Sequence, residues 1–299
     1  MAKRIQNASD LNTGIVSFIQ GIIKIGASSK GNAFDETVRS LLLKELSGAV
    51  LIDDKRWGSK SSTSIFREYR KRSMTKNFDF TDLQPIVDNT QPLDLIIVDK
   101  PNGSQNWPDL LIIYNQIGLP IEVKSTENDS IVWNSGFPRF DGIYIFNCYG
   151  KSTTTCFLGQ HAINKFELDE LKTSSKEASQ HNKKCGGTRW SYYVRDMYNS
   201  SQSFIESKSL PTELIKLGND IKEAESKLKC GCTTSGKNLT FNQIEALKVS
   251  IEEKTEKFIA LDNEFNRQKH RREEMERETI EFIQKLPWTT NQNTDFDPV

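Results

Sequence analysis

Apolar residues follow two different patterns in the first half of the chain, and the two patterns predict different elements. Residues 13–25 are apolar and amphipathic, and residues 32–46 repeat their apolar positions at helical spacing, so each segment predicts a helix. Short continuous apolar runs at 110–113, 119–124 and 143–148 have the length and composition of strands. Residues 156–159 are expected to extend the sheet, and residues 164–172 to form another helix. The pattern predicts an α/β fold, a mixed β-sheet with flanking helices.

From residue 210 onward, apolar positions repeat every three or four residues in two long segments. The repeats consist of Leu214, Leu217, Ile221, Ala224 and Leu228, and of Ile244, Leu247, Ile251, Phe258, Leu261 and Phe265. The glycine-containing stretch 230–238 separates them, and Thr240 with Gln243 has the spacing of a capping box. We therefore expect a main domain over 1–205, a C-terminal antiparallel α-helical hairpin resembling a coiled coil over 206–287, and a tail over 288–299.

Acidic residues interrupt two of the apolar runs, and this is where the chain carries its clearest candidate chemistry. Asp109 opens the run 110–113, turn residues follow at 115–118, and Glu122 and Lys124 lie in the run 119–124. If the two runs pair as an antiparallel hairpin with Tyr114 opposite Leu119, Asp109 is opposite Lys124. Side chains alternate along a strand, so Glu122 and Lys124 share one face. The hairpin thus gathers two carboxylates and one ammonium at one end.

Two alternatives bear on this interpretation. The same acids could be solvated charges on a surface hairpin, but both lie against strongly apolar runs, where an unpaired charge is costly. Asp94 is a rival for the first acid, because it also precedes a strand-like run. Asp109 is preferred since only it follows a proline in the pair Pro108-Asp109.

The trio suits metal-assisted phosphodiester hydrolysis, since Mg²⁺ prefers oxygen ligands and is usually held by one or two carboxylates. Pro108-Asp109 followed by Glu122-Val123-Lys124 resembles the signature of the PD-(D/E)XK nuclease superfamily. Ser125 and the flanking segments 101–104 and 133–138 extend the resemblance to type II restriction endonucleases of that superfamily. The resemblance implies that Asp109 and Glu122 bind Mg²⁺ and that Lys124 is the catalytic lysine.

Glu36, in the first turn of the helix expected over 32–46, is a further candidate. By the same resemblance, restriction enzymes often carry a glutamate on a helix before the catalytic sheet, so Glu36 is expected as an additional acidic residue near the metal. The alternative is that an acid at this position only stabilises the helix dipole.

Basic residues are concentrated between residues 55 and 76, where Glu68 is the only acid. We expect this patch to contact the DNA backbone, because cationic side chains neutralise phosphates; a solvated basic surface is the alternative. Arg189 and Arg195, among aromatic residues, are candidate base readers, although surface arginines flanking an aromatic core are the alternative. The full set assigned to DNA contact is Lys55, Arg56, Lys60, Arg67, Arg70, Lys71, Arg72, Asn134, Arg189 and Arg195.

The overall composition bears more on where the protein is located in the cell than on what it does. The 299 residues contain 40 Lys and Arg and 40 Asp and Glu, so net charge gives no sign of a nucleic-acid partner. The N-terminus lacks the apolar region of a signal peptide, and no run approaches the roughly 18–20 apolar residues of a membrane span. A cytoplasmic protein with reduced cysteines is expected. His181, Cys185, Cys230 and Cys232 permit a zinc site, with free thiols as the alternative.

The resemblance to type II restriction enzymes implies a Mg²⁺-dependent, sequence-specific endonuclease that cleaves duplex DNA and acts as a homodimer. Two-fold symmetry in such a protein would mirror a palindromic site. One alternative is a repair or recombination nuclease that recognises DNA structure. Another is a non-catalytic DNA-binding or coiled-coil assembly protein, in which the acidic centre is inert. The C-terminal hairpin could serve dimerisation, embrace DNA or brace the main domain.

Overall fold

The computed structural model describes residues 5–25, 31–52, 95–101, 107–115, 117–127, 130–133, 137–139, 142–184, 198–200, 209–233, 237–286 and 288. The chain divides into two compact units, one made of residues 1–201 with 274–299 and the other of residues 202–273. Strands β1 to β8 belong to the first unit. Helix α7 (Ser209–Cys230) belongs to the second unit, and helix α8 (Phe241–Gln284) runs from the second unit into the first.

The first unit is built on a six-stranded mixed sheet with the order β1-β2-β3-β4-β6-β7. Its strands are β1 (Val50–Ile52), β2 (Leu95–Asp99), β3 (Leu110–Tyr114), β4 (Ile117–Thr126), β6 (Ile143–Cys148) and β7 (Thr153–Leu158). The pairs β1–β2 and β4–β6 are parallel, and the other neighbours are antiparallel. The prediction of an α/β fold with a mixed sheet and flanking helices is therefore confirmed.

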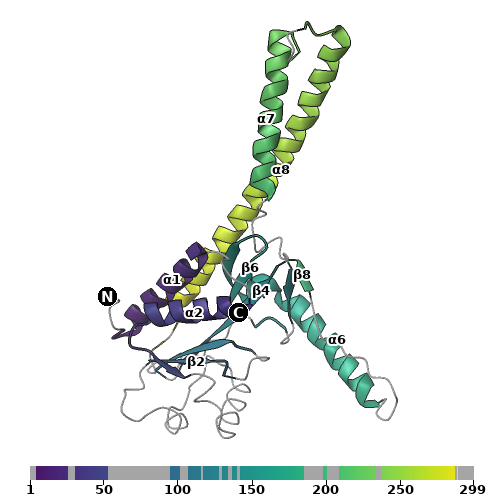
Figure 1. Ribbon diagram of the computed structural model, residues 1–299. Helices are drawn as coiled ribbons and strands as arrows, with labels where there is room; N and C mark the ends of the chain where they lie inside the picture. Colours follow the sequence, from purple (N-terminus) through teal and green to yellow (C-terminus); the bar gives the residue numbers. More distant parts are fainter. Residues whose placement is uncertain are drawn as a thin grey trace. The chain divides into compact units, whose positions relative to one another are not determined.

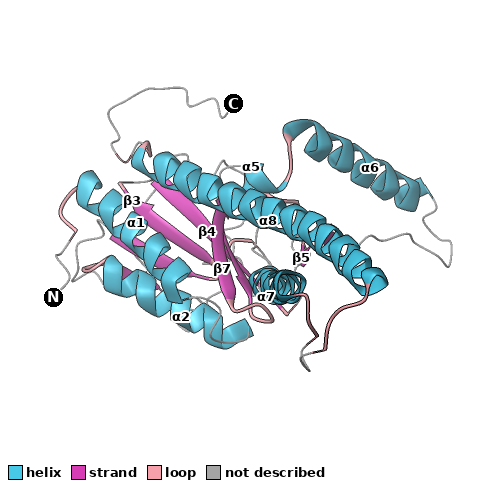
Figure 2. Ribbon diagram, turned by 90° about the horizontal axis from the view of Figure 1, so that it is seen from above, coloured by secondary structure: helices cyan, strands magenta, loops and turns pink. Residues whose placement is uncertain are grey.

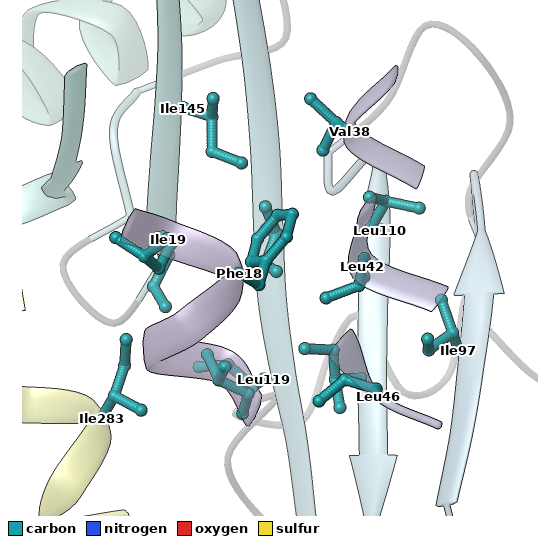
Figure 3. Close-up of a cluster of buried hydrophobic side chains, with 14 of the residues drawn as sticks. Phe18, Ile19, Val38, Leu42, Leu46, Ile97, Leu110, Leu119, Ile145 and Ile283 are labelled. Atoms are coloured by element: carbon teal, nitrogen blue, oxygen red, sulfur yellow. The ribbon is translucent and has the colours of Figure 1, made fainter. Parts of the chain in front are cut away.

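Helices α1 (Ala8–Ile25) and α2 (Gly31–Glu45) cover one face of this sheet (Figures 1 and 2). Each turns one apolar stripe inward, as the helical spacing predicts; in α2 the stripe is Phe34, Val38 and Leu42, all fully buried. Alternate residues of β3 and β4, such as Leu110 and Leu119, complete the same core (Figure 3). The sequence therefore places α2 against the strands that carry the candidate acids.

The last turns of α8 and the residues after it also belong to this core. Ile283 belongs to the same buried cluster as Ile19 of α1 (Figure 3), and Trp288 is 1% exposed. Contacts with α1 and with the end of β3 fix Trp288: its indole N–H donates to Asn12, its carbonyl accepts a hydrogen bond from Asn115 at 2.8 Å, and its ring meets Tyr114 edge-on. The position expected to begin a tail is thus one of the most buried in the first unit.

The antiparallel pairing of β3 and β4 is as predicted, but the predicted register is wrong. Tyr114 is opposite Ile117 rather than Leu119. The reason is that Asn115 adopts a positive φ of 46°, which permits a tighter turn, so Ile117 and Gly118 pair within β4. The error is two residues, and because side chains alternate with a period of two, every residue keeps its predicted face.

Smaller elements complete the first unit. Helices α5 (Gly159–Ala162) and α6 (Lys165–Lys184) follow β7, and β5 (Ser130–Val132) pairs with β8 (Tyr198–Ser200) in a separate two-stranded sheet. The strand expected at 156–159 and the helix expected at 164–172 correspond to β7 and α6.

In the second unit, α7 and α8 contain the two apolar repeats predicted from the sequence. The capping box forms as expected: the Thr240 backbone N–H donates to the Gln243 side chain at 2.9 Å, and the Gln243 N–H donates to the Thr240 hydroxyl at 3.4 Å. The two helices contact one another, since Lys254 lies 3.8 Å from Asp220. None of the described helices is long and apolar enough to cross a membrane.

Candidate functional site

The candidate site lies at the first residue of β3, where the pairing of β3 with β4 ends and β4 extends further along β6. The β3–β4 ladder ends at Leu110 opposite Ile121, whereas β4 remains paired with β6 as far as Thr126. Asp109 immediately precedes β3, and its Oδ2 accepts a hydrogen bond from the Val123 backbone N–H at 2.8 Å. A carboxylate thus takes the place of a strand partner at the point where the two strands separate. This contact fixes Asp109 against the segment that carries Glu122 and Lys124.

Glu122 and Lys124 form a buried ion pair on the same face of β4. Lys124 Nζ lies 2.7 Å from Glu122 Oε1, and the two side chains are 12% and 4% exposed. Tyr144 and Phe146 of β6 are their neighbours across the parallel pair, and Tyr144 stacks on Phe157 of β7. The charged pair therefore lies beside aromatic side chains rather than in open solvent. Because the surroundings are less polar than water, the electrostatic interactions of the pair are stronger.

Helix α2 contributes two more charged side chains. Asp35 and Arg39 are four residues apart, so they lie side by side on the flank of the buried stripe that contains Val38. Arg39 forms an ion pair with Asp99, the last residue of β2, which is 7% exposed. Because β2 and β3 are antiparallel, the end of β2 adjoins the start of β3 and brings this pair towards Asp109.

The acids influence one another electrostatically. Burial, and next the Glu122 carboxylate, raise the pKa of Asp109 to about 7, while the Val123 hydrogen bond acts in the opposite direction. Burial also raises the pKa of Asp35, to which Asp99 and Glu122 contribute, with Lys100 and Arg39 opposing them. Burial and the neighbouring carboxylates therefore disfavour the ionised forms of Asp109 and Asp35. A bound cation would favour those ionised forms.

The structure brings together Asp109, Glu122 and Lys124, the three residues predicted from the hairpin. Glu36 is exposed on α2, whereas the half-buried Asp35, one residue earlier, is the α2 acid whose charge interacts with Asp109 and Glu122. Sequence reasoning also missed Asp99, which ends an apolar run as Asp109 begins one.

Several predicted residues lie outside the described residues. These are Asp94, Cys185 and the whole set assigned to DNA contact: Lys55, Arg56, Lys60, Arg67, Arg70, Lys71, Arg72, Asn134, Arg189 and Arg195. Their assignments stay predictions.

The oxygen donors suit a hard cation but supply few ligands. Across the described ranges, no group of three or more His, Cys, Asp or Glu side chains is arranged to hold a metal ion, and this applies to His181, Cys230 and Cys232 as well. Mg²⁺ needs fewer protein ligands than that, since one or two carboxylates with water and phosphate oxygens complete its shell. Asp109 and Glu122 fit such a site, because both are carboxylates, and because burial and then the neighbouring Glu122 charge raise the pKa of Asp109, which a bound cation would counteract.

Comparison with protein-family models, with curated proteins and with solved structures finds no match to this chain.

Proposed function

We propose that this protein is a Mg²⁺-dependent endonuclease that cleaves duplex DNA at specific sequences, a type II restriction enzyme of the PD-(D/E)XK superfamily. The observation that supports this most is the Asp109–Val123 hydrogen bond, because it joins the acid before β3 to the strand segment that carries Glu122 and Lys124. A buried acid pair with an adjacent lysine, held on rigid strands, is suited to hydrolysis of a phosphodiester.

Each residue has a distinct role in this proposal. Asp109 and Glu122 would hold Mg²⁺, and a bound Mg²⁺ would polarise the scissile phosphate and lower the pKa of a coordinated water. Lys124, 2.7 Å from Glu122, orients the attacking water and stabilises the negative charge that develops on the phosphate. Asp35 adds a further carboxylate beside the pair, and Arg39 holds Asp99 in place through their ion pair.

We further infer that α7 and α8 form an antiparallel helical hairpin. Support comes from the approach of Lys254 to Asp220 and from Gly218, where an added Cβ would lie 3.6 Å from the Phe258 ring. In a cytoplasmic homodimer acting on DNA, this hairpin has three possible roles, namely dimerisation, enclosure of the DNA, or bracing of the sheet. Pairing of two copies would match the two-fold symmetry of a palindromic site.

The experiment that tests the function is incubation of the full chain with unmethylated phage DNA in Mg²⁺ or in EDTA. We expect discrete fragments in Mg²⁺ and intact DNA in EDTA. Glu122→Gln, which keeps the shape of the side chain, should leave the DNA intact. Glu223→Gln is the matched control, because Glu223 also pairs with a lysine but is exposed on α7, and it should cleave normally.

Three other outcomes would replace the proposal. Cleavage restricted to branched or damaged DNA would identify a structure-selective nuclease. Retention of DNA on the protein without cleavage, in several metals and salts, would identify a binding protein. Cleavage by Glu122→Gln at the wild-type rate would place the active centre elsewhere in the chain.

A further inference from the structure

A second chemically distinctive group lies in the second unit, where the chain passes from α7 to α8. Cys230 is the last residue of α7, Gly231 follows with a φ of +67°, and Cys232 forms an isolated antiparallel bridge with Asn238. A Cβ at Gly231 would meet nothing within 4 Å, so the glycine is required by the backbone conformation and not by lack of space. The left-handed residue turns the chain so that the two cysteines lie in one tight turn.

The two cysteines are in direct contact through hydrogen bonds. Cys230 Sγ accepts a hydrogen bond from the Cys232 backbone N–H at 3.3 Å, and Sγ also lies 3.4 Å from the Cys232 carbonyl oxygen. The turn is closed by backbone hydrogen bonds from Leu239 to Gly231, at 2.8 Å, and from Thr233 to Lys237, at 2.7 Å. The cysteines are thus held near one another by the backbone around them, independently of the acidic site.

Exposure separates this pair from the other described cysteines. Cys230 is exposed and Cys232 half-buried, whereas Cys148 and Cys156 are fully buried in the sheet of the first unit. Burial raises the pKa of the Cys156 thiol well above its ordinary value, which makes it inert as a nucleophile. Only the pair between α7 and α8, among the described cysteines, combines access to solvent with a neighbouring thiol.

The two thiols are also unequal. Two hydrogen bonds lower the pKa of Cys230: the larger contribution comes from the Cys232 side chain and the smaller from the Cys232 backbone. The same side-chain contact raises the pKa of Cys232. A thiolate attacks disulfides, and a neighbouring thiol can then resolve the mixed disulfide. Cys230 is therefore placed to attack first and Cys232 to resolve.

We propose that Cys230 and Cys232 form a redox-active dithiol that closes reversibly to a disulfide by exchange with low-molecular-weight disulfides. The Cys230 thiolate attacks one sulfur of the small disulfide, the S–S bond breaks, and one thiolate leaves. Cys232 then loses its proton and attacks the Cys230 sulfur, the mixed bond breaks, and a second thiolate leaves. The dithiol is oxidised by two electrons, and the small disulfide is reduced to two thiols.

The test exposes the full-length folded protein to oxidised glutathione, followed by acid quenching, alkylation and peptide mapping by mass spectrometry. In the wild type we expect a Cys230–Cys232 disulfide that dithiothreitol reverses. Cys232→Ser should stop at a glutathione adduct on Cys230. Cys230→Ser should form an adduct on Cys232 at least about tenfold more slowly, because its thiol lacks the same activation. Circular dichroism checks that the variants keep their helices.

Three results would overturn the proposal. One is a stable glutathione adduct in the wild type without ring closure, which would show that the turn cannot bring the sulfurs into bonding distance. A second is equal reaction rates for the two single variants. The third is a disulfide that links either cysteine to Cys185; the Cys185→Ser variant identifies this case, because it would then fail to form any disulfide.

Discussion

Two glutamate–lysine pairs of nearly equal length show how differently the two units use charge. Glu122 and Lys124 in the first unit are 2.7 Å apart and almost fully buried, whereas Glu223 and Lys227 on α7 are 2.6 Å apart with side chains 62% and 31% exposed. An exposed pair is screened by water and contributes little to stability. A buried pair must offset the cost of removing both charges from water. The exposed pair on α7 therefore has little effect on the free energy of unfolding, whereas the buried pair in β4 carries a large desolvation cost.

This difference supports the functional interpretation of the first unit. A hydrophobic pair of similar volume would often be neutral or stabilising at a buried position. The carboxylates around Asp109 add to the cost, since burial and Glu122 raise the pKa of Asp109 to about 7. Clusters of this kind are typical of functional sites, where stability is given up for chemistry.

The largest effect is expected in activity. Glu122→Gln should lower the rate of the proposed Mg²⁺-dependent DNA cleavage on the order of a thousandfold, because it removes a proposed metal ligand and the partner of Lys124. Glu223→Gln should leave the rate unchanged. The measurement is single-turnover cleavage of a duplex that carries one mapped site. Equal losses of cleavage rate in the two variants would contradict a special role of the buried pair in cleavage.

Stability should separate the same two pairs. Lys124→Met is expected to lower the free energy of unfolding by about 3 kcal/mol, since it leaves the Glu122 carboxylate buried without that cation. Lys227→Met should change it little, because its partner Glu223 is exposed and stays solvated when the lysine is removed. Urea unfolding measures both. The double variant Lys124→Met with Glu122→Gln should recover most of the loss; no recovery would mean that packing, not charge, accounts for the effect.

The pH dependence of stability tests the repulsion at Asp109. Its folded-state pKa, about 7, lies above the ordinary value of 3.8, so the folded protein binds this proton more tightly than the unfolded chain. Stability from this group is complete below the ordinary value and is lost as pH rises towards 7. In EDTA, the free energy of unfolding of Asp109→Asn should therefore exceed that of the wild type by about 4 kcal/mol at pH 8 and nearly match it at pH 4. Thermal unfolding across this range is the measurement, and a constant difference would contradict it.

The smallest effect is expected at the start of α2. Asp35→Asn should lower the cleavage rate by about tenfold, because the carboxylate is near Glu122 but is only one contributor to the field. Glu36→Gln, its exposed neighbour, should cleave at the wild-type rate. The reverse result would restore Glu36 as the functional acid and would contradict the geometry of α2.

The outcome for the predicted residues follows from the periodicity of each element. In β4, an even error in register leaves every face unchanged, so Glu122 and Lys124 were correctly grouped with Asp109 although the turn was misplaced. In α2, adjacent residues are about 100° apart, so Glu36 is exposed while its neighbour Asp35 lies beside the acids of the candidate site. The apolar stripe through Val38 contained the information needed, because Asp35 and Arg39 both flank it.

Contacts between segments far apart in the sequence could not be predicted from these patterns. Asp99 ends an apolar run in the same way as several other residues, and its pairing with Arg39 joins segments 60 positions apart. Trp288 follows the end of a long helix with no periodic signal, yet it is buried against α1 and β3 through Asn12 and Tyr114. Both depend on tertiary packing, which local periodicity does not encode.

The central claim is that Asp109 and Glu122 hold the divalent cation on which cleavage depends. Titration of the folded protein with Mn²⁺, followed by electron paramagnetic resonance and with Mg²⁺ as competitor, tests this directly. We expect wild type and Glu223→Gln to bind Mn²⁺ alike, with Mg²⁺ displacing it, and Asp109→Asn and Glu122→Gln to bind at least about tenfold more weakly. Equal Mn²⁺ affinity in all four proteins would show that the buried acids hold no metal, and the account would be wrong.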